Sequence, residues 1–390
     1  MTSNRLRLNL AVQDCFLYMN DLYIIDNDNR IGSISLFLIY EKYLKNGSDS
    51  YNVAVSSAFV NNREYFESSK YKGDEFRKLF EKGWKEIHNQ GGVEIEVDKA
   101  DIDFFAGFDE SYVLNFSLYA KKILITSKSG IYQGTISSTG IFNSKKKLDL
   151  VKLHDVQSIN VYPKIGDVLF LSKSDGVFRG SFDKNMDSVQ MIQNPVLSES
   201  NGIGWIDNNV LNYKSDLEVE YIKNDTKKVE DGLDAATNFD VSDDSNSTVR
   251  IEKFASEIED ISSKVSANSE KFESTLLSYN TNSFLFLINR AGTIQGHRLA
   301  DNGDISETFV WANRLNIDKL GGPLSAHIVG RGSVIEFYSS VYSFYRGKVE
   351  QIYNSNCLDI KSFTNSRNYR QIVAVINEDY LELHSFNPML

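Results

Sequence analysis

The sequence predicts an all-β fold in which one short unit is repeated along the chain. Residues 123–136 read as a strand, a tight polar turn and a second strand, because apolar runs flank the turn Ser127–Gly130. Aromatic residues make up 12% of the chain, and their flat side chains favour pleated surfaces. The hairpin pattern returns closely once and more loosely three times, in the segments 168–182, 284–299, 334–349 and 372–386.

The spacing of these hairpins indicates which repeat fold they build. Gly134 and Gly180 hold equivalent places and are 46 residues apart, while Gly296 and Gly347 are 51 apart. A period of about forty to fifty residues, with several strands in each unit, is typical of propeller blades. The chain therefore resembles the β-propeller superfold, with a WD-repeat-like architecture. No Trp-Asp dipeptide, the signature of WD repeats, occurs, so the resemblance extends to the fold and to no particular family.

Counting the β units predicts the number of blades. If the first and last segments complete one blade between them, the chain forms seven blades in a single domain over residues 1–390, with six or eight blades as alternatives. Closing the ring in this way would leave no open sheet edge. The segments that read as β units are 10–40, 51–60, 93–136, 156–182, 201–222, 276–311, 325–349 and 358–386.

The N-terminal region is predicted to consist of strands. Apolar and polar residues alternate on both sides of Asp26–Asn29, and Asn and Asp favour a turn there because they tolerate left-handed backbone angles. The alternation continues to Tyr40. After Gly47, the run Tyr51–Phe59 is also predicted to be a strand.

Residues 61–92 interrupt the repeat and are predicted as a helical insertion. Phe80, Trp84 and Ile87 recur at three- and four-residue spacing, which is typical of an amphipathic helix, and Gly91 with its neighbouring glycine ends it. A large aromatic side chain on an inserted helix can anchor a protein partner. We therefore predict that Trp84 contacts a partner.

Residues 223–275 form a second predicted insertion with two different halves. Over 225–248 the chain carries seven acidic residues against two lysines, which predicts an acidic disordered loop. The second half predicts an amphipathic helix with a short heptad stripe that needs a surface to pack on. We predict that this stripe binds a partner, with docking on the chain's own blades as the alternative. Its residues are Ile251, Phe254, Ile258, Ile261, Val265 and Phe272.

Charge and cysteine content narrow the classes of function. The net charge of -11 argues against nucleic-acid binding, which needs clustered Lys and Arg, and no apolar window is long enough for a membrane helix. The N-terminus carries no apolar core of the kind that a signal peptide has. Two cysteines, Cys15 and Cys357, are too few for a disulfide framework; they read as free thiols, with a bond between them as the alternative. We expect a cytoplasmic protein.

The sequence carries no motif that specifies a reaction. None of the five histidines forms an HExxH motif or has a cysteine at zinc-like spacing, and no GxxxxGK[ST] loop or GxSxG elbow occurs. The acidic run Glu94–Asp103 could bind a cation, but the alternation around Val93, Ile95 and Val97 favours a solvated strand face. We predict no catalytic, metal-binding or cofactor-binding residue.

Two functions from different classes remain. The first is a non-enzymatic platform or scaffold subunit that binds protein partners through the inserted helices and blade loops, and we favour it because catalytic motifs are missing from the sequence. The alternative is an enzyme, or a sensor of a metal or small ligand, with its site in the central propeller channel. In that case carboxylates from different blades would have to converge. The sequence leaves the oligomeric state open.

Overall fold

The structure is a computed structural model, and the residues that it describes form seven β-sheets. Every sheet has the strand order of a propeller blade, and the chain is a seven-bladed β-propeller, as the repeat spacing predicts. The described residues are 3–60, 73–107, 113–137, 147–164, 166–183, 185–206, 209–215, 218–222, 248–250, 275–281, 284–300, 305–311, 314–330, 332–345, 348–364, 366 and 368–387.

Six sheets are four-stranded antiparallel blades. The first two are β2 (Asp14–Tyr18), β3 (Asp21–Ile25), β4 (Arg30–Ser35) and β6 (Asp103–Gly107), and β7 (Val113–Tyr119), β8 (Lys122–Ser127), β9 (Gly130–Ser137) and β10 (Lys147–His154). The next two are β11 (Asn160–Lys164), β12 (Asp167–Ser172), β13 (Gly176–Phe182) and β14 (Val189–Met191), and β15 (Gly202–Ile206), β16 (Asn209–Ser215), β17 (Glu218–Ile222) and β18 (Thr248–Arg250). The last two are β19 (Thr275–Asn280), β20 (Phe284–Asn289), β21 (Ile294–Leu299) and β22 (Ile305–Val310), and β23 (Pro323–Val329), β24 (Gly332–Phe337), β25 (Ser340–Tyr345) and β26 (Lys348–Tyr353).

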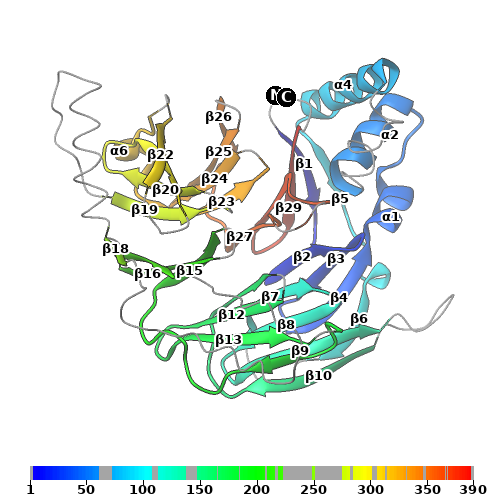
Figure 1. The fold of residues 1–390 in the computed structure, drawn as a ribbon. Coiled ribbons are helices and arrows are strands. Elements are labelled where there is room, and N and C mark those ends of the chain that lie inside the picture. The colour runs from blue at the N-terminus through cyan, green and yellow to red at the C-terminus, as the bar shows by residue number, and fades with distance from the viewer. Residues whose placement is uncertain are drawn as a thin grey trace, which may run out of the picture. The chain divides into compact units, whose positions relative to one another are not determined.

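The seventh sheet, which we call the closure blade, joins the two ends of the chain. Its strands, in spatial order, are β27 (Asp359–Ser362), β28 (Ile372–Ile376), β29 (Leu381–Phe386), β1 (Ser3–Leu8) and β5 (Val93–Ile95). β1 pairs with β29 in antiparallel register, with Leu6 opposite Leu383, and β5 adds a parallel strand outside it (Figure 1). The two ends of the chain do share a blade, as predicted, but through β1, which precedes the predicted first segment; residues 10–40 contribute β2–β4 to a separate blade with β6.

All five copies of the hairpin pattern form the second and third strands of a blade. The copy at 123–136 is β8 and β9, and every residue of β8 is buried. The sequences of these strands are nearly continuous apolar runs because both faces of the strands are covered. The turn between them needs its glycine, since Gly130 has a φ of +142° and a Cβ there would lie 2.3 Å from the carbonyl oxygen of His154.

The blades divide into two compact units. Unit 1 comprises Met1–Gln157 and Pro323–Leu390, and unit 2 comprises Ser158–Gly322. In unit 1, the helical segment and the closure blade share one hydrophobic core that includes Leu8, Trp84 and Leu383. In unit 2, the β15–β18 and β19–β22 blades share a core around Leu211 and Leu285.

The helical insertion is longer than predicted. α4 (Asp74–Asn89) confirms the predicted helix, but the predicted strand at Tyr51–Phe59 is wrong. That segment forms helices, and the residues before it do as well: α1 (Leu36–Ile39), the π-helical η1 (Tyr40–Leu44), α2 (Asp49–Val55) and the π-helical η2 (Ser56–Val60). Two further short helices are the 3₁₀ turn η4 (Lys99–Asp101) and α6 (Ile317–Leu320).

The reason for the error lies in the period of the apolar residues. Tyr51, Ala54, Val55 and Ala58 are all buried and follow a helical spacing, although the run is also rich in β-favouring residues. Ser48 adds a local signal, because its Oγ accepts from the backbone N–H of Tyr51 over 3.4 Å and caps α2. The segment 51–60 is therefore no β unit. The count of seven blades holds because a second error compensates: the segments 10–40 and 358–386 belong to two different blades instead of sharing one.

The second insertion falls almost wholly outside the described residues, which resume only for β18 between 223 and 275. The predicted acidic loop and amphipathic helix stay predictions from sequence. Within the part of the chain that the structure describes, no helix has the length and apolar character needed to cross a membrane.

Candidate functional site

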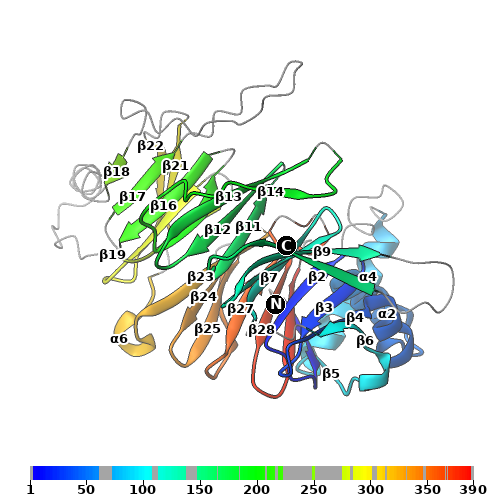
Figure 2. The same ribbon diagram turned by 90° about the horizontal axis from the view of Figure 1, so that it is seen from below.

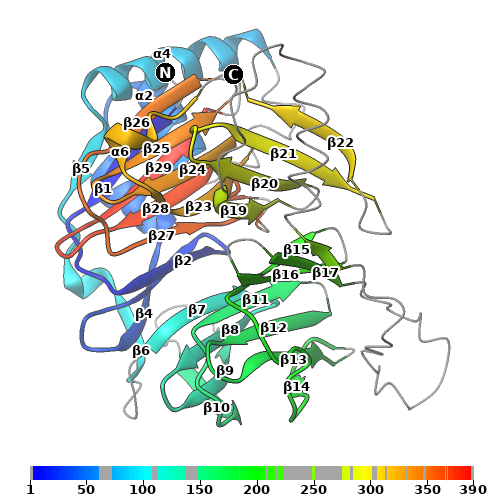
Figure 3. The same ribbon diagram turned by 90° about the vertical axis from the view of Figure 1, so that its left-hand side faces the viewer.

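Two surfaces of unit 1 stand out, and the first is built on the innermost strands of its blades. β23, β27, β2 and β7 are each the inner strand of a blade, and neighbours in this series pack side by side. Figures 2 and 3 show β23 and β24 next to the strands of the closure blade. Polar side chains on and beside these strands form two groups of contacts, which together we call the inner-strand network. One group is Asp14, Asp359 and Lys361, and the other is Ser325, His327, Glu336 and Cys357.

Lys361 connects two blades through ion pairs. Its Nζ lies 3.2 Å from Asp14 Oδ1 on β2 and 3.2 Å from Asp359 Oδ2 on its own strand. Burial would lower the pKa of Lys361, but the two carboxylates raise it above its ordinary value. Burial also raises the pKa of Asp14 to about 6, although Lys361 opposes the change. The lysine is therefore charged at neutral pH and positions the start of β27 against β2.

A second group of contacts centres on Glu336. Ser325 Oγ donates to Glu336 Oε2 over 2.6 Å, and Cys357 Sγ donates to Glu336 Oε1 over 3.4 Å. Burial and the nearby Glu336 carboxylate raise the pKa of Cys357 to about 12, so the thiol stays protonated at neutral pH. His327 Nε2 lies 2.9 Å from Ser325 Oγ, and burial lowers the pKa of His327 to about 4.

The direction of these hydrogen bonds decides whether Ser325 can be activated as a nucleophile. Ser325 has one hydroxyl proton and donates it to Glu336, so the contact with His327 needs a hydrogen on Nε2. A histidine in that tautomer cannot take the serine proton as a general base. The network therefore lacks the serine–histidine arrangement of a nucleophilic hydrolase. Among the described residues, no three His, Cys, Asp or Glu side chains lie together in a way that could hold a metal ion.

The second surface, which we call the turn–helix patch, consists of Met19, Phe37 and Leu38. Met19 lies in the two-residue turn between β2 and β3, and the other two lie on α1. The backbone N–H of Leu36 donates to the carbonyl oxygen of Asn20 over 2.8 Å, which holds the helix start against the turn. Met19, Phe37 and Leu38 are 59%, 61% and 37% exposed, so three large apolar side chains share one exposed site.

The backbone at Met19 is strained. Met19 and Asn20 have φ angles of +47° and +66°, which makes the turn type I′. Asn tolerates this conformation, whereas a long side chain without local hydrogen bonds costs about 1–2 kcal/mol there. Ala120, at the first position of the turn between β7 and β8, has a similar φ of +49°, so the conformation itself recurs in this chain. Met19 differs in combining it with a long, exposed apolar side chain, which favours contact with a partner.

Charged side chains beside the patch are paired within the chain. Lys45 Nζ lies 2.9 Å from Glu41 Oε2, and Lys42 Nζ lies 2.7 Å from Asp101 Oδ2. Tyr43 donates a short hydrogen bond to the same Asp101 carboxylate. The part of the surface next to Phe37 therefore presents paired charges around an apolar centre.

Trp84, which we predicted to contact a partner, is 2% exposed and lies in the core of unit 1. Its ring centroid is 5.3 Å from that of Phe80, and its backbone carbonyl accepts from Asn4 Nδ2 over 3.0 Å. The indole thus packs α4 against the closure blade. A partner of α4 would meet the opposite side of the helix.

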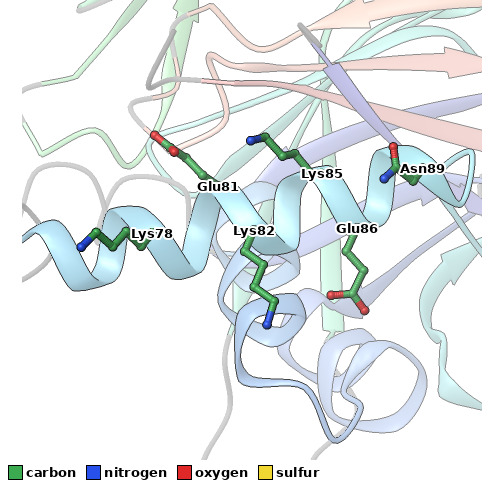
Figure 4. A pocket seen from close by; sticks show the side chains of 6 residues that line it. All are labelled: Lys78, Glu81, Lys82, Lys85, Glu86 and Asn89. Carbon is green, nitrogen blue, oxygen red and sulfur yellow. The ribbon is translucent and has the colours of Figure 1, made fainter.

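That opposite side is a shallow hollow of charged and amide side chains. All six come from one helix, and acidic and basic residues alternate at three- and four-residue spacing, as on a solvated helix face. Figure 4 shows that they do not converge on one point. They are Lys78, Glu81, Lys82, Lys85, Glu86 and Asn89.

The remaining predicted residues divide into described and undescribed ones. Ile251, Phe254, Ile258, Ile261, Val265 and Phe272 lie outside the described residues, and their role in partner binding stays a prediction. In the acidic run, Glu94, Glu96 and Asp98 are exposed, while Ile95 and Val97 are buried, which confirms the solvated strand face. Cys15 and Cys357 are unpaired thiols.

Sequence reasoning missed both surfaces. Asp14 and Lys361 are 347 positions apart, and nothing in the local sequence links them. The turn–helix patch has a weak signal, since Met19-Asn20 between two apolar runs has turn character only at its second residue. A methionine at the first position of such a turn is the feature that could have been noticed.

The comparisons with known proteins identify no family for the chain. No protein-family model matches the chain, and no curated protein matches it. The streptogramin B lyase structure aligns over 99% of each chain with a TM-score of 0.48 and 8% identity. The β-propeller domain of Cps50 (Swd1) from Myceliophteria thermophila aligns over 97% of each chain, with a TM-score of 0.48 and 9% identity.

A third similar structure is the extracellular domain of a hybrid two-component system protein from B. thetaiotaomicron. It matches 96% of this chain with a TM-score of 0.48 and 9% identity, and the match spans only 40% of that protein's chain. Likenesses this distant carry no functional argument. The fold assignment rests on the seven sheets themselves.

Proposed function

We propose that this protein is a non-enzymatic interaction platform whose protein partner docks on the turn–helix patch. The observation that supports this most is Met19, an exposed apolar side chain held at a positive φ beside the exposed Phe37. Neither the exposed apolar side chain nor the positive φ of Met19 stabilises the folded chain. A partner that covers Met19 and Phe37 would bury their apolar surface. The patch combines a blade loop with an inserted helix.

The charges around the patch indicate the partner's chemistry. The two lysines Lys42 and Lys45 are balanced by the carboxylates of Asp101 and Glu41, so these pairs leave no net charge for a charged partner to neutralise. The partner surface should therefore be apolar and uncharged at its centre, with Phe37 and Met19 as the anchoring side chains.

A cytoplasmic location is part of the proposal. Two unpaired thiols, Cys15 and Cys357, support a reducing compartment. The proposal assigns no reaction to the protein.

The test uses a substitution that removes the contact and suits the turn. Met19→Asn places a residue that tolerates the positive φ, so the melting temperature should stay constant or rise, and Phe37→Ser removes the second anchor. The tagged double variant, expressed in the native host, should capture the partner of the unchanged protein at least about tenfold less efficiently.

The matched control is Val151→Asn on β10, because Val151 is also 61% exposed and lies on a different blade. Quantitative mass spectrometry of the captured proteins gives the readout. Equal capture by the double variant and the control would refute the proposal. A fall in the melting temperature of Met19→Asn would show instead that Met19 packs against its own fold.

A further inference from the structure

A second group of exposed apolar side chains surrounds the inner-strand network. Tyr338 is 72% exposed, and Leu324 and Leu358 are each 57% exposed. We call these three residues the rim patch. They come from two neighbouring blades, since Leu324 lies in β23, Tyr338 directly follows β24 and Leu358 immediately precedes β27.

Local structure explains why each side chain points outward. Leu324 is the extra residue of a β-bulge, because the β23–β24 register shifts between Pro323 and Ser325. Tyr338 lies in the turn that follows Phe337, and Leu358 lies between Cys357 and the first residue of β27. A bulge of this kind re-aims a side chain and is typical of sites beside functional residues.

The three rim residues are close in sequence to residues that meet at Glu336. Ser325, next to Leu324, and Cys357, next to Leu358, both donate to this carboxylate. Tyr338 is two residues beyond Glu336 on the same chain segment. Each rim residue thus lies within two residues of Ser325, Glu336 or Cys357, so the rim patch borders the inner-strand network directly.

The network beneath the rim patch carries an excess of negative charge. Asp14, Glu336 and Asp359 are three carboxylates, and Lys361 is the cation that pairs with two of them. His327 is neutral at neutral pH because burial lowers its pKa to about 4. The Asp359 side chain is 44% exposed, so part of this charge is open to an incoming group.

We propose that the rim patch binds a segment of a protein partner that carries a lysine or arginine flanked by apolar side chains. The cationic head meets Asp359 and Glu336, and the methylene stem lies along Leu324 and Leu358. Tyr338 offers an aromatic face to the same cation. Carboxylates in excess repel phosphate, which excludes a nucleic-acid occupant at this surface. This proposal is independent of the turn–helix patch.

The test is a selection with random peptides displayed on phage, made against the whole protein. Peptides with Lys or Arg between apolar residues should be enriched. Their synthetic versions should bind about tenfold more weakly to Leu324→Ser and to Asp359→Asn, and replacing the basic residue with norleucine should have the same effect. Raising the salt concentration should also weaken binding.

The control is Val310→Ser, because Val310 is 56% exposed but lies on β22 in unit 2. Melting curves establish that each variant is folded. Peptides that depend on Leu324 but show no enrichment of basic residues would overturn the cationic recognition. A selection without any peptide that depends on Leu324 or Asp359 would overturn the docking surface itself.

Discussion

Arg7 Nη2 donates to Glu382 Oε1 over 2.7 Å and thereby links the first strand of the chain to the last. The side chain of Glu382 is fully buried and also contacts Arg5 at 3.3 Å and His384 at 3.0 Å. Burial would raise the pKa of Glu382, but hydrogen bonds from His384 and Arg7 keep it below the ordinary value. The closure blade thus depends on a buried carboxylate as well as on its backbone ladder.

Glu382→Gln should weaken this closure. The amide keeps the shape but removes the charge that neutralises two arginines, so the free energy of unfolding should fall by about 2–3 kcal/mol at neutral pH. Urea unfolding measures the change. Glu94→Gln is the matched control, because Glu94 is half-exposed and lies 3.9 Å from Arg7, and it should cost less than about 0.5 kcal/mol. Equal effects of the two variants would show that burial of Glu382 is unimportant.

Gly83→Ala should separate α4 from α2. A Cβ at Gly83 would lie 1.9 Å from the backbone carbonyl oxygen of Ser50, and a backbone atom cannot move aside as a side-chain end can. We expect a loss of about 2–4 kcal/mol in the free energy of unfolding, measured by thermal or urea unfolding. Gly47→Ala, where a Cβ would meet no atom within 4 Å, should change it little. A tolerated Gly83→Ala would contradict the close approach of these helices.

Asp14→Asn should change how stability depends on pH. Burial raises the pKa of Asp14 to about 6 in the folded chain, so the folded state holds this proton more tightly than the unfolded state. The contribution of Asp14 to the free energy of unfolding is therefore greatest at low pH. It falls by up to about 3 kcal/mol as the pH rises from about 4 to 6. Because Asn does not titrate, the variant should lack this decline.

The measurement is urea unfolding of both proteins across about pH 4 to 7. Other titrating groups, such as His297 and His327, whose pKa values burial lowers to about 4, affect both proteins alike and cancel in the difference. Parallel pH profiles would show that Asp14 does not titrate in this window.

The repeat could be predicted from sequence because middle strands are buried on both faces. Their apolar runs, separated by a turn that needs glycine, leave the same pattern wherever a blade occurs, as in β8–β9 and β12–β13. The error at Tyr51–Phe59 arose because short apolar runs fit both helical and strand spacing. Only contact with α4 across Gly83 settles that segment as a helix.

The sequence by itself determined the all-β repeat and the α4 helix, since both depend on local periodicity. Tertiary structure alone decided that Trp84 is buried and that Lys361 joins Asp14 to Asp359. It also decided that Met19 and Phe37 share an exposed patch. These outcomes depend on which residues distant in sequence meet in space, and local patterns of apolar and polar residues do not encode that.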